Sequence, residues 1–302
     1  MRNSFFGDRL VFADNSTITD KLFVVLQYVL PLHCLSRAVG WLAECEIPAI
    51  KNFLIEQFIR QFKVNMNEAA QPDFKRYQNF NDFFTRPLAD GLRPISDDAV
   101  ACPADGAISQ AGTIEAGRIF QAKGQSYTTE ELLGGDSELA ARFDDGYFAT
   151  IYLSPKDYHR VHMPVQGKLL RTFYIPGDLF SVNTVTAENV PRVFSRNERL
   201  VCIFDTPQGE MALVLVGALI VAGIETVWSG QVAPPLRAIK MTDYTQPPAV
   251  VELDKGAEMG RFKLGSTAIV LFPKSSGLAW TISAGEAVKM GQGIAIQQPA
   301  LN

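Results

Sequence analysis

The sequence is poor in the features that mark small secreted, zinc-binding or nucleic-acid-binding proteins. Only four of its 302 residues are cysteine, and none form a Cys-x-x-Cys pair, so neither a zinc set nor a disulfide framework is expected. This cysteine usage indicates a reducing, cytosolic setting. Lys and Arg number 28 against 32 Asp and Glu and form no dense run, which argues against nucleic acid as a partner.

Long apolar runs are also missing. Residues 1–19 carry four charged side chains and no apolar core of the length that a secretory signal needs. The best candidate runs, 22–32 and 211–224, are shorter than the roughly 20 residues that a membrane-spanning helix requires. A chain of this kind that meets a membrane is expected to lie on its surface.

What the chain does contain suits a folded domain with an appendage. Hydrophobic residues make up 47% of the sequence and charged residues 20%, both ordinary for a globular protein. A chain of this length can bury a sizeable core, so disorder is not expected. Near residue 64 the sequence changes from apolar residues at helical spacing to short β-rich runs separated by Gly and Pro. This change predicts a helical region at 1–64 and a β-rich catalytic domain at 65–302.

The region 1–64 predicts three helices. Apolar segments 22–32 and 35–42 are separated by Pro31, and Pro48 precedes the third helix. In that third helix apolar residues recur at helical spacing, namely Ile50, Phe53, Leu54, Phe58, Ile59 and Phe62. Such a face either packs against the rest of the fold or lies in a membrane interface, and both interpretations stay open here.

The region 65–302 predicts short strands between Gly and Pro turns. The expected strands are 148–153, 168–175, 200–204, 211–221 and 267–272, and the expected helical segments are 80–84 and 128–142. The predicted class is therefore α+β, a mostly antiparallel β core with an N-terminal amphipathic helical region.

Two of only three histidines, His159 and His162, lie within the segment 154–164. Histidine is the side chain best suited to moving protons near neutral pH, so this concentration indicates a catalytic site. A shared metal ion is the alternative, but no cluster of Cys or carboxylate residues stands out to complete its ligands. We therefore expect no metal.

Two further segments carry possible chemistry. Asp105 lies in a Pro-Ala-Asp-Gly sequence that is typical of a turn, yet beside a histidine it can orient an imidazole. Gly265 and Ser266 precede an apolar strand and lack the Gly-x-Ser-x-Gly pattern of common hydrolases. A serine hydroxyl next to an unhindered glycine carbonyl can instead attack it and convert the peptide bond into an ester.

Together these elements resemble the bacterial phosphatidylserine decarboxylases, and the likeness covers nearly the whole chain. It reaches the cleavage tetrad of that family at Leu-Gly-Ser-Thr, residues 264–267. The other segments that carry it are 80–88, 103–106, 121–124, 152–183, 196–199, 224–228 and 259–263. Gly-Ser-Thr alone would mean nothing, but the tetrad together with the two-histidine block, in this order, is highly specific.

The resemblance implies a proenzyme that cuts itself between Gly265 and Ser266, giving a β chain (1–265) and an α chain (266–302). Asp105, His162 and Ser266 are the implied self-cleavage triad, in which His162 takes the serine proton and Asp105 orients the imidazole. Ser266 attacks the Gly265 carbonyl, and β-elimination from the resulting ester releases the Gly265 carboxylate. Hydrolysis of the remaining dehydroalanine, with loss of ammonia, leaves a pyruvoyl group at position 266.

The resemblance also implies the reaction. The pyruvoyl cofactor derived from Ser266 forms a Schiff base with phosphatidylserine and draws in electrons as CO₂ leaves, as pyridoxal phosphate does elsewhere. His159 is the implied proton donor before phosphatidylethanolamine is released, and His162 can contribute to both stages. The implied setting is peripheral, on the cytoplasmic side of the cell membrane, as a homodimer of α/β heterodimers.

Other classes fit parts of the pattern. A lipid hydrolase with the same Asp-His-Ser set, or a non-enzymatic membrane-binding module, would keep its chain whole. The module would also tolerate the loss of His162. A pyruvoyl enzyme acting on a soluble amino acid is a third alternative, against which the amphipathic region 1–64 argues.

Overall fold

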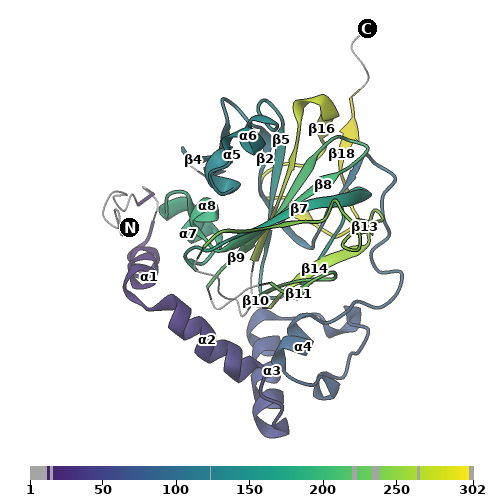
Figure 1. Ribbon diagram of the computed structural model, residues 1–302. Coiled ribbons are helices and arrows are strands. Elements are labelled where there is room, and N and C mark those ends of the chain that lie inside the picture. The colour runs from purple at the N-terminus through teal and green to yellow at the C-terminus, as the bar shows by residue number, and fades with distance from the viewer. Residues whose placement is uncertain are drawn as a thin grey trace.

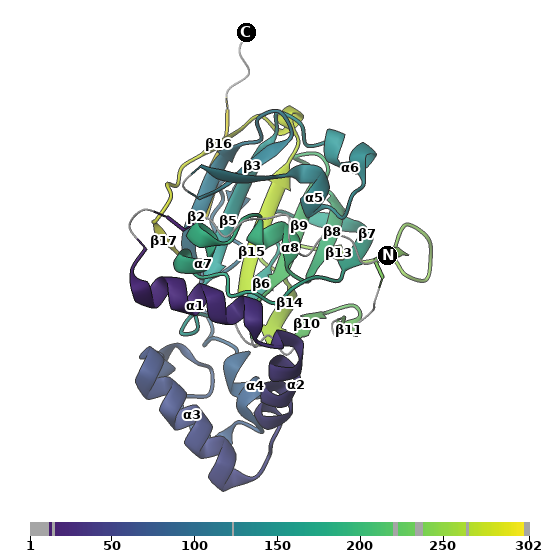
Figure 2. The ribbon, with the colours of Figure 1, turned by 90° about the vertical axis from the view of Figure 1, so that its left-hand side faces the viewer.

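The computed structural model describes residues 12–13, 16–122, 124–219, 223–232, 238–263 and 266–298. A large antiparallel sheet forms the centre of the molecule, and four N-terminal helices gather at one end of it (Figures 1 and 2). The predicted α+β class, with a mostly antiparallel core and N-terminal helices, is confirmed.

The three predicted N-terminal helices are present as α1 (Ile18–Val29), α2 (Leu32–Ala43) and α3 (Pro48–Phe62). Thr17 and Asp20 form a capping box that begins α1, and Pro48 occupies the first turn of α3, where its missing N–H costs nothing. Among the described residues no single helix is long and apolar enough to cross a membrane. The pair α1 and α2 passes that test jointly, but with a bend of 91° between them.

α3 packs against the segment that follows it. This segment contains the short 3₁₀ helices η1 (Met66–Glu68) and η2 (Phe74–Arg76) and the helix α4 (Phe80–Phe84). Their shared buried cluster consists of Ala43, Ile55, Val64, Tyr77, Phe80, Phe83 and Phe84. The cluster thus joins residues on both sides of the predicted boundary at residue 64, and that boundary stays a prediction.

α1 is fixed to the sheet domain by a polar side chain. Gln27, which interrupts the apolar run in the sequence, is buried, and its Oε1 accepts a hydrogen bond from the Ser181 N–H at 2.7 Å. Its Nε2 lies 3.3 Å from the hydroxyl of Thr186, in α7 (Thr184–Asn189). Because both ends of this buried amide are paired, it orients α1 on the domain surface.

The large sheet contains nine strands. They are β2 (Gly106–Thr113), β5 (Tyr147–Leu153), β7 (Gly167–Ile175), β8 (Arg199–Asp205), β9 (Met211–Gly217), β12 (Lys240–Asp243), β13 (Glu252–Leu253), β15 (Ser266–Phe272) and β17 (Ala287–Val288). Their order is β12-β7-β8-β9-β15-β5-β2-β17, with β13 also paired to β7. β15 therefore lies between β9 and β5, in the interior of the sheet.

Both faces of this sheet are covered, which explains why β15 reads as one apolar run. Val270 packs into the cluster on one face, and its neighbours Ile269 and Leu271 pack into the cluster on the other. The second face carries α7, α5 (Thr129–Leu132), α6 (Ser137–Ala141), α8 (Val193–Arg196) and the hairpin β3 (Arg118–Ala122) and β4 (Gln125–Thr128), as Figure 2 shows.

Smaller sheets contribute to the first face. One contains β1 (Val100–Ala101), β16 (Leu278–Trp280) and β18 (Gly293–Gln297), and a 3₁₀ turn, η3 (Lys274–Ser276), precedes β16. The other contains β6 (Arg160–His162), β10 (Gly223–Thr226), β11 (Gly230–Gln231) and β14 (Glu258–Lys263), in the order β11-β10-β14-β6.

Two predicted elements differ from the structure. The helix expected at 128–142 is wrong as a single element, because Gly134 and Gly135 adopt φ values of 92° and 90° and separate α5 from α6. The strand expected at 211–221 ends at Gly217, and residues 220–222 lie outside the described part of the chain.

Candidate active site

Ser266 begins β15 at the end of the large sheet. It is buried and aligned with Leu153 of β5 on one side and Gly217 of β9 on the other. Its hydroxyl is buried without a hydrogen-bond partner among the described residues. Buried hydroxyls normally find a partner, and the hydroxyl of the neighbouring Thr267 is also unpaired, so the start of this strand is a candidate site. Gly265, the other half of the predicted cleavage site, lies outside the described residues.

His159 lies beside the strand ends that flank Ser266. Its Nε2 is 3.1 Å from the carbonyl oxygen of Ser154, the residue that follows β5, and its own carbonyl accepts a hydrogen bond from the Phe262 N–H at 3.0 Å. The ring stacks on Phe84 of α4, with centroids 4.0 Å apart and an interplanar angle of 24°. Nδ1 is buried and has no partner among the described residues.

The environment keeps His159 neutral. Burial, followed by the positive charge of the nearby Arg86, lowers the pKa of His159 to about 3. Since a carbonyl oxygen only accepts, Nε2 carries the proton and Nδ1 presents a lone pair. His159 is therefore neutral at neutral pH, with its lone pair on Nδ1.

His162 is the last residue of β6, and both of its ring nitrogens are occupied. Nδ1 is 2.8 Å from the carbonyl oxygen of Gly256, so it donates there, and Nε2 is 2.9 Å from the hydroxyl of Tyr158. The backbone N–H of His162 donates to the carbonyl of Pro103 at 2.8 Å, which brings the Asp105 segment beside it. Burial lowers the pKa of His162 below its ordinary value.

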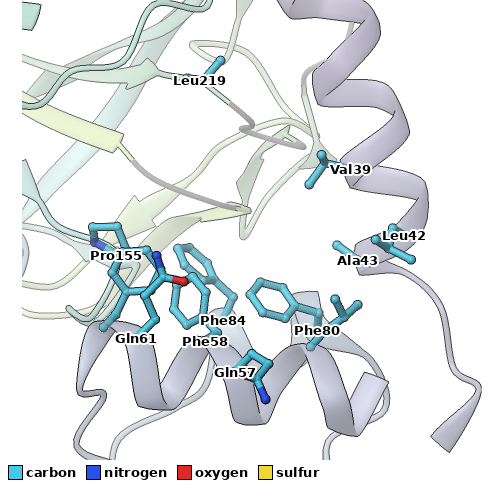
Figure 3. A pocket seen from close by; sticks show the side chains of 12 residues that line it. Val39, Leu42, Ala43, Gln57, Phe58, Gln61, Phe80, Phe84, Pro155 and Leu219 are labelled. Atoms are coloured by element: carbon cyan, nitrogen blue, oxygen red, sulfur yellow. The ribbon is translucent and has the colours of Figure 1, made fainter. Parts of the chain in front are cut away.

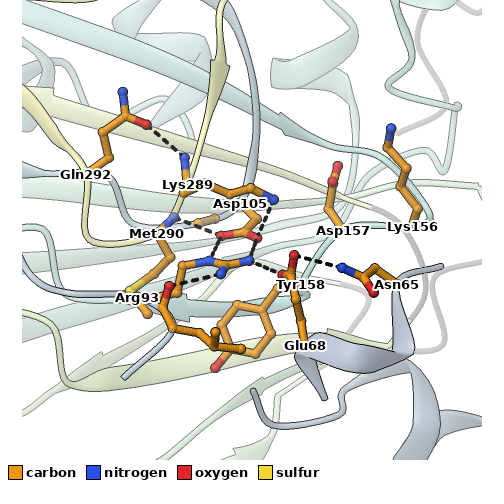
Figure 4. Close-up of polar contacts among 12 residues, drawn as sticks. Asn65, Glu68, Arg93, Asp105, Lys156, Asp157, Tyr158, Lys289, Met290 and Gln292 are labelled. Atoms are coloured by element: carbon orange, nitrogen blue, oxygen red, sulfur yellow. Dashed lines mark hydrogen bonds and ion pairs between the residues drawn. The ribbon is translucent and has the colours of Figure 1, made fainter. Parts of the chain in front are cut away.

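Asp105 lies in a buried ion cluster, drawn in Figure 4. Its two carboxylate oxygens accept bonds from Arg93 Nε at 3.0 Å and Arg93 Nη2 at 2.6 Å, a bidentate pair. Lys289 Nζ at 3.1 Å and the backbone N–H of Met290 at 2.8 Å complete the set. Arg93 is paired in turn with Glu68 at 2.5 Å.

These contacts keep Asp105 charged. Burial raises its pKa, but the hydrogen bonds from Arg93 and the Met290 N–H and the charge of Lys289 outweigh burial, so the pKa of Asp105 lies below its ordinary value. The charge of Asp105 offsets a small part of the burial that lowers the pKa of both histidines.

The predicted triad is only partly brought together. In the described part of the chain no hydrogen bond joins the side chains of Asp105, His162 and Ser266, since the first two are held by other groups. What the fold does provide is proximity of the backbone segments that carry Asp105 and His162. The roles assigned to these three residues and to His159 stay predictions.

A cavity of about 380 Å³ lies beside the site, between the N-terminal helices and the sheet (Figure 3). Pro155 and Leu219, two residues beyond the partners of Ser266 in β5 and β9, form part of its wall, and Phe84 forms another part. Phe84 therefore separates the cavity from the ring of His159. The lining is almost wholly apolar, with Gln57 and Gln61 as its polar members.

Comparison with known proteins shows to which family this chain belongs. A family model described as phosphatidylserine decarboxylase matches residues 80–296. The chain belongs to the phosphatidylserine decarboxylase family. A second model, described as PSD, matches residues 22–63. The resemblance inferred from the sequence is confirmed.

Curated bacterial relatives are similar to this family member over most of its length. A phosphatidylserine decarboxylase proenzyme of Ectopseudomonas mendocina (strain ymp) is 58% identical over 90% of this chain and 96% of that protein. The proenzyme of the same name from Pseudomonas aeruginosa (strain UCBPP-PA14) is 57% identical over 93% of this chain and 99% of that protein. The one from Pseudomonas putida (strain F1) is 57% identical over 91% and 97%.

Sequence reasoning missed several residues that shape the site of this phosphatidylserine decarboxylase family member. Phe84, Arg86 and Tyr158 lie inside segments that carry the resemblance, but nothing in their spacing connects them with a histidine ring. No sequence pattern pointed to Arg93 or Lys289 as site residues, because their contacts with Asp105 span up to 184 positions of the chain.

Among the described residues no group of three or more His, Cys, Asp or Glu side chains is placed to hold a metal ion.

Proposed function

We propose that this member of the phosphatidylserine decarboxylase family converts phosphatidylserine into phosphatidylethanolamine and CO₂ after cutting its own chain before Ser266. The activity follows from the relatives, which are named phosphatidylserine decarboxylase proenzymes and share 57–58% of their residues with this chain. The observation that carries the self-processing is Ser266 itself, whose buried, unpaired hydroxyl begins a strand in the interior of the sheet.

In the proposed self-cleavage, Ser266 Oγ attacks the carbonyl carbon of Gly265 and the peptide bond becomes an ester. His162 takes the hydroxyl proton and passes it to the Ser266 nitrogen as the C–N bond breaks, and the charge of Asp105 stabilises the imidazolium in between. Loss of the α-proton of Ser266 then breaks the ester and frees the Gly265 carboxylate. A water molecule hydrolyses the remaining dehydroalanine and releases ammonia. His162 must exchange its bond with Tyr158 for one with Ser266 to serve in this way.

The residues around position 266 suit a pyruvoyl group. Such a group supplies an electron sink for the loss of CO₂. The buried hydroxyl of Ser266 has no partner that conversion to a carbonyl would leave unpaired, and its strand neighbours form an apolar core.

His159 is the proposed proton carrier. Burial disfavours the imidazolium of His159, so the proton that it carries at Nδ1 is readily given up. A bound substrate brings its ammonium group as the proton source, and its carboxylate raises the pKa of the imidazole enough to receive that proton. His159 then delivers the proton to the carbon from which CO₂ has left, and the low pKa makes this imidazolium a strong acid.

Membrane contact is proposed for the outer face of the N-terminal helices. Large apolar side chains are exposed along α1, α2 and the start of α3, among them Ile18, Leu22, Val29, Trp41, Ile47 and Phe53. Exposed apolar patches of this kind mark surfaces that bind lipid or protein. We propose that this face lies on the cytoplasmic surface of the cell membrane and that the chain acts there as a homodimer of α/β heterodimers.

Intact-mass analysis of the purified protein, beside Ser266→Ala, tests the proposed self-processing. The wild type should give residues 1–265 and a small chain 266–302 that is one ammonia lighter than a peptide beginning with serine. Ser266→Ala should stay whole. Decarboxylation is then measured as CO₂ released from vesicles that contain phosphatidylserine.

A wild-type chain that stays at its full mass of 33.3 kDa would overturn the self-processing and favour an uncleaved hydrolase or binding module. A processed chain that releases no CO₂ from phosphatidylserine would overturn the substrate assignment alone.

A further inference from the structure

The ring of His159 is held by a helix that the proposed self-cleavage does not use. Phe84, the last residue of α4, stacks on the imidazole at 4.0 Å between centroids. Phe84 is itself held from behind by Phe58 of α3, with centroids 5.8 Å apart in an edge-on contact. The N-terminal helices thus reach the histidine through two aromatic rings.

The loop before His159 is fixed by the same segment of chain. Arg86 Nη2 donates to the carbonyl of Lys156 at 3.0 Å, and Arg160 Nε donates to the carbonyl of Thr85 at 2.8 Å. Arg86 is buried, with its guanidinium 5.4 Å from the ring centre of Phe83. These two bonds clamp both ends of the histidine loop onto the residues that follow α4.

The Phe84 stacking and these two hydrogen bonds, together called the clamp, determine which ring nitrogen of His159 has no hydrogen-bond partner among the described residues. Stacking on Phe84 fixes the plane of the imidazole, and the fixed loop places the Ser154 carbonyl where it holds Nε2. Nδ1 is then left without a partner in a buried site. An imidazole without these restraints could turn and exchange the nitrogen that faces the Ser154 carbonyl, and even small misplacements of a catalytic group cost large factors in rate.

We propose that Phe84 and Arg86 are positioning residues for the decarboxylation step: Phe84 fixes the ring of His159 and Arg86 fixes its loop, so that Nδ1 stays available for the substrate proton. The inference rests on the proposed role of His159. Self-cleavage does not depend on this clamp, since the ring nitrogens of His162 are held by Tyr158 and Gly256 instead.

The test compares Phe84→Leu with Phe80→Leu. Both substitutions remove a phenyl ring from α4, but only Phe84 stacks on His159, whereas Phe80 stacks on Phe84 and Phe58. Each variant is examined for self-cleavage by intact mass and for kcat and KM on phosphatidylserine vesicles. Phe84→Leu should cleave fully and lose at least tenfold in kcat, with KM within twofold. Phe80→Leu should keep kcat within twofold of the wild type, and Phe84→Tyr, which retains the ring, should recover most of the loss.

Arg86→Lys provides a second, independent test. It keeps the positive charge but loses the planar fork that reaches the loop, so kcat should fall at least fivefold with complete cleavage and unchanged KM. This arm decides the proposal if Phe84→Leu fails to fold or to cleave. Wild-type kcat in Phe84→Leu, or wild-type kcat in Arg86→Lys, overturns the proposal. An inactive wild type would instead overturn the proposed function.

Discussion

His159 and His162 are three positions apart, yet the fold gives their ring nitrogens different surroundings. His162 is bonded at both nitrogens, whereas His159 keeps Nδ1 unpaired. The difference comes from neighbours that are distant in sequence, Gly256 for one ring and Phe84 for the other. At the scale of single residues, the division of labour between the two histidines is therefore a property of their contacts.

The buried, neutral state of His159 predicts an acid-sensitive stability. Its pKa falls from 6.5 to about 3 on folding, so below pH 6.5 the unfolded chain binds a proton that the folded chain does not. Stability should then decrease as pH falls, by up to about 1.4 kcal/mol per pH unit. Urea unfolding between pH 7 and pH 5 measures this slope.

His159→Gln should flatten that slope. An identical slope in wild type and His159→Gln would show that this histidine is not buried in its neutral form. His162, whose pKa is also lowered by burial, should account for part of the slope that remains.

The ion cluster around Asp105 predicts a second effect on stability. In the uncleaved Ser266→Ala background, Asp105→Asn removes the carboxylate that pairs with the buried Arg93 and should lower the free energy of unfolding by roughly 3 kcal/mol. The control is Asp145→Asn, whose exposed pair with Lys274 should matter by less than about 1 kcal/mol.

The contribution of Asp105 to the free energy of unfolding should also depend on pH. Because the folded pKa of Asp105 is lowered, its contribution is complete above the ordinary carboxyl pKa and disappears as pH falls through the folded value. The difference in unfolding free energy between Ser266→Ala and the double variant Ser266→Ala/Asp105→Asn should therefore narrow in acid. A constant difference would argue that the loss comes from packing and not from charge.

At the scale of elements, α1 and α2 combine two surfaces. The inner surface binds the domain through Val24 and Gln27, and the outer surface exposes apolar side chains. Sequence periodicity left both interpretations of the helical region open, and the structure shows a packed face and an exposed face side by side. Lys51 illustrates the limit of pattern reasoning: it falls between apolar positions of α3, yet it is buried with its ammonium bonded to the carbonyls of Lys75 and Tyr77.

Trp41 provides a test of the outer face, since 78% of its surface is exposed on α2. Trp41→Gln should weaken binding to vesicles of phosphatidylserine and phosphatidylcholine about tenfold, because burial of a large apolar side chain is worth about 1.5–3 kcal/mol. Co-sedimentation measures the change. Met241→Gln, at a position on β12 that is 53% exposed and lies at the edge of the large sheet, is the control. Equal binding by the two variants would remove α2 from the membrane surface.

At the scale of the whole molecule, the position of β15 predicts that cleavage leaves the fold intact. The small chain 266–302 begins with this strand, which is bonded to β5 on one side and β9 on the other and is buried along its length. Lys289 and Met290 of the same chain also hold Asp105. The two processed chains should therefore elute together in native gel filtration and separate only in denaturant. Release of the small chain without denaturant would contradict this arrangement.

Sequence by itself determined the family, the α+β class and the positions of the main strands and N-terminal helices. These depend on local patterns: apolar runs bounded by Gly and Pro, helical spacing, and a tetrad that follows a two-histidine block. Only the tertiary structure decided the partners of Asp105, the free nitrogen of His159 and the burial of Lys51. The physical reason is distance along the chain, because Arg93, Lys289 and Phe84 meet their partners only after the sheet and the helices have packed, and no local pattern records such contacts.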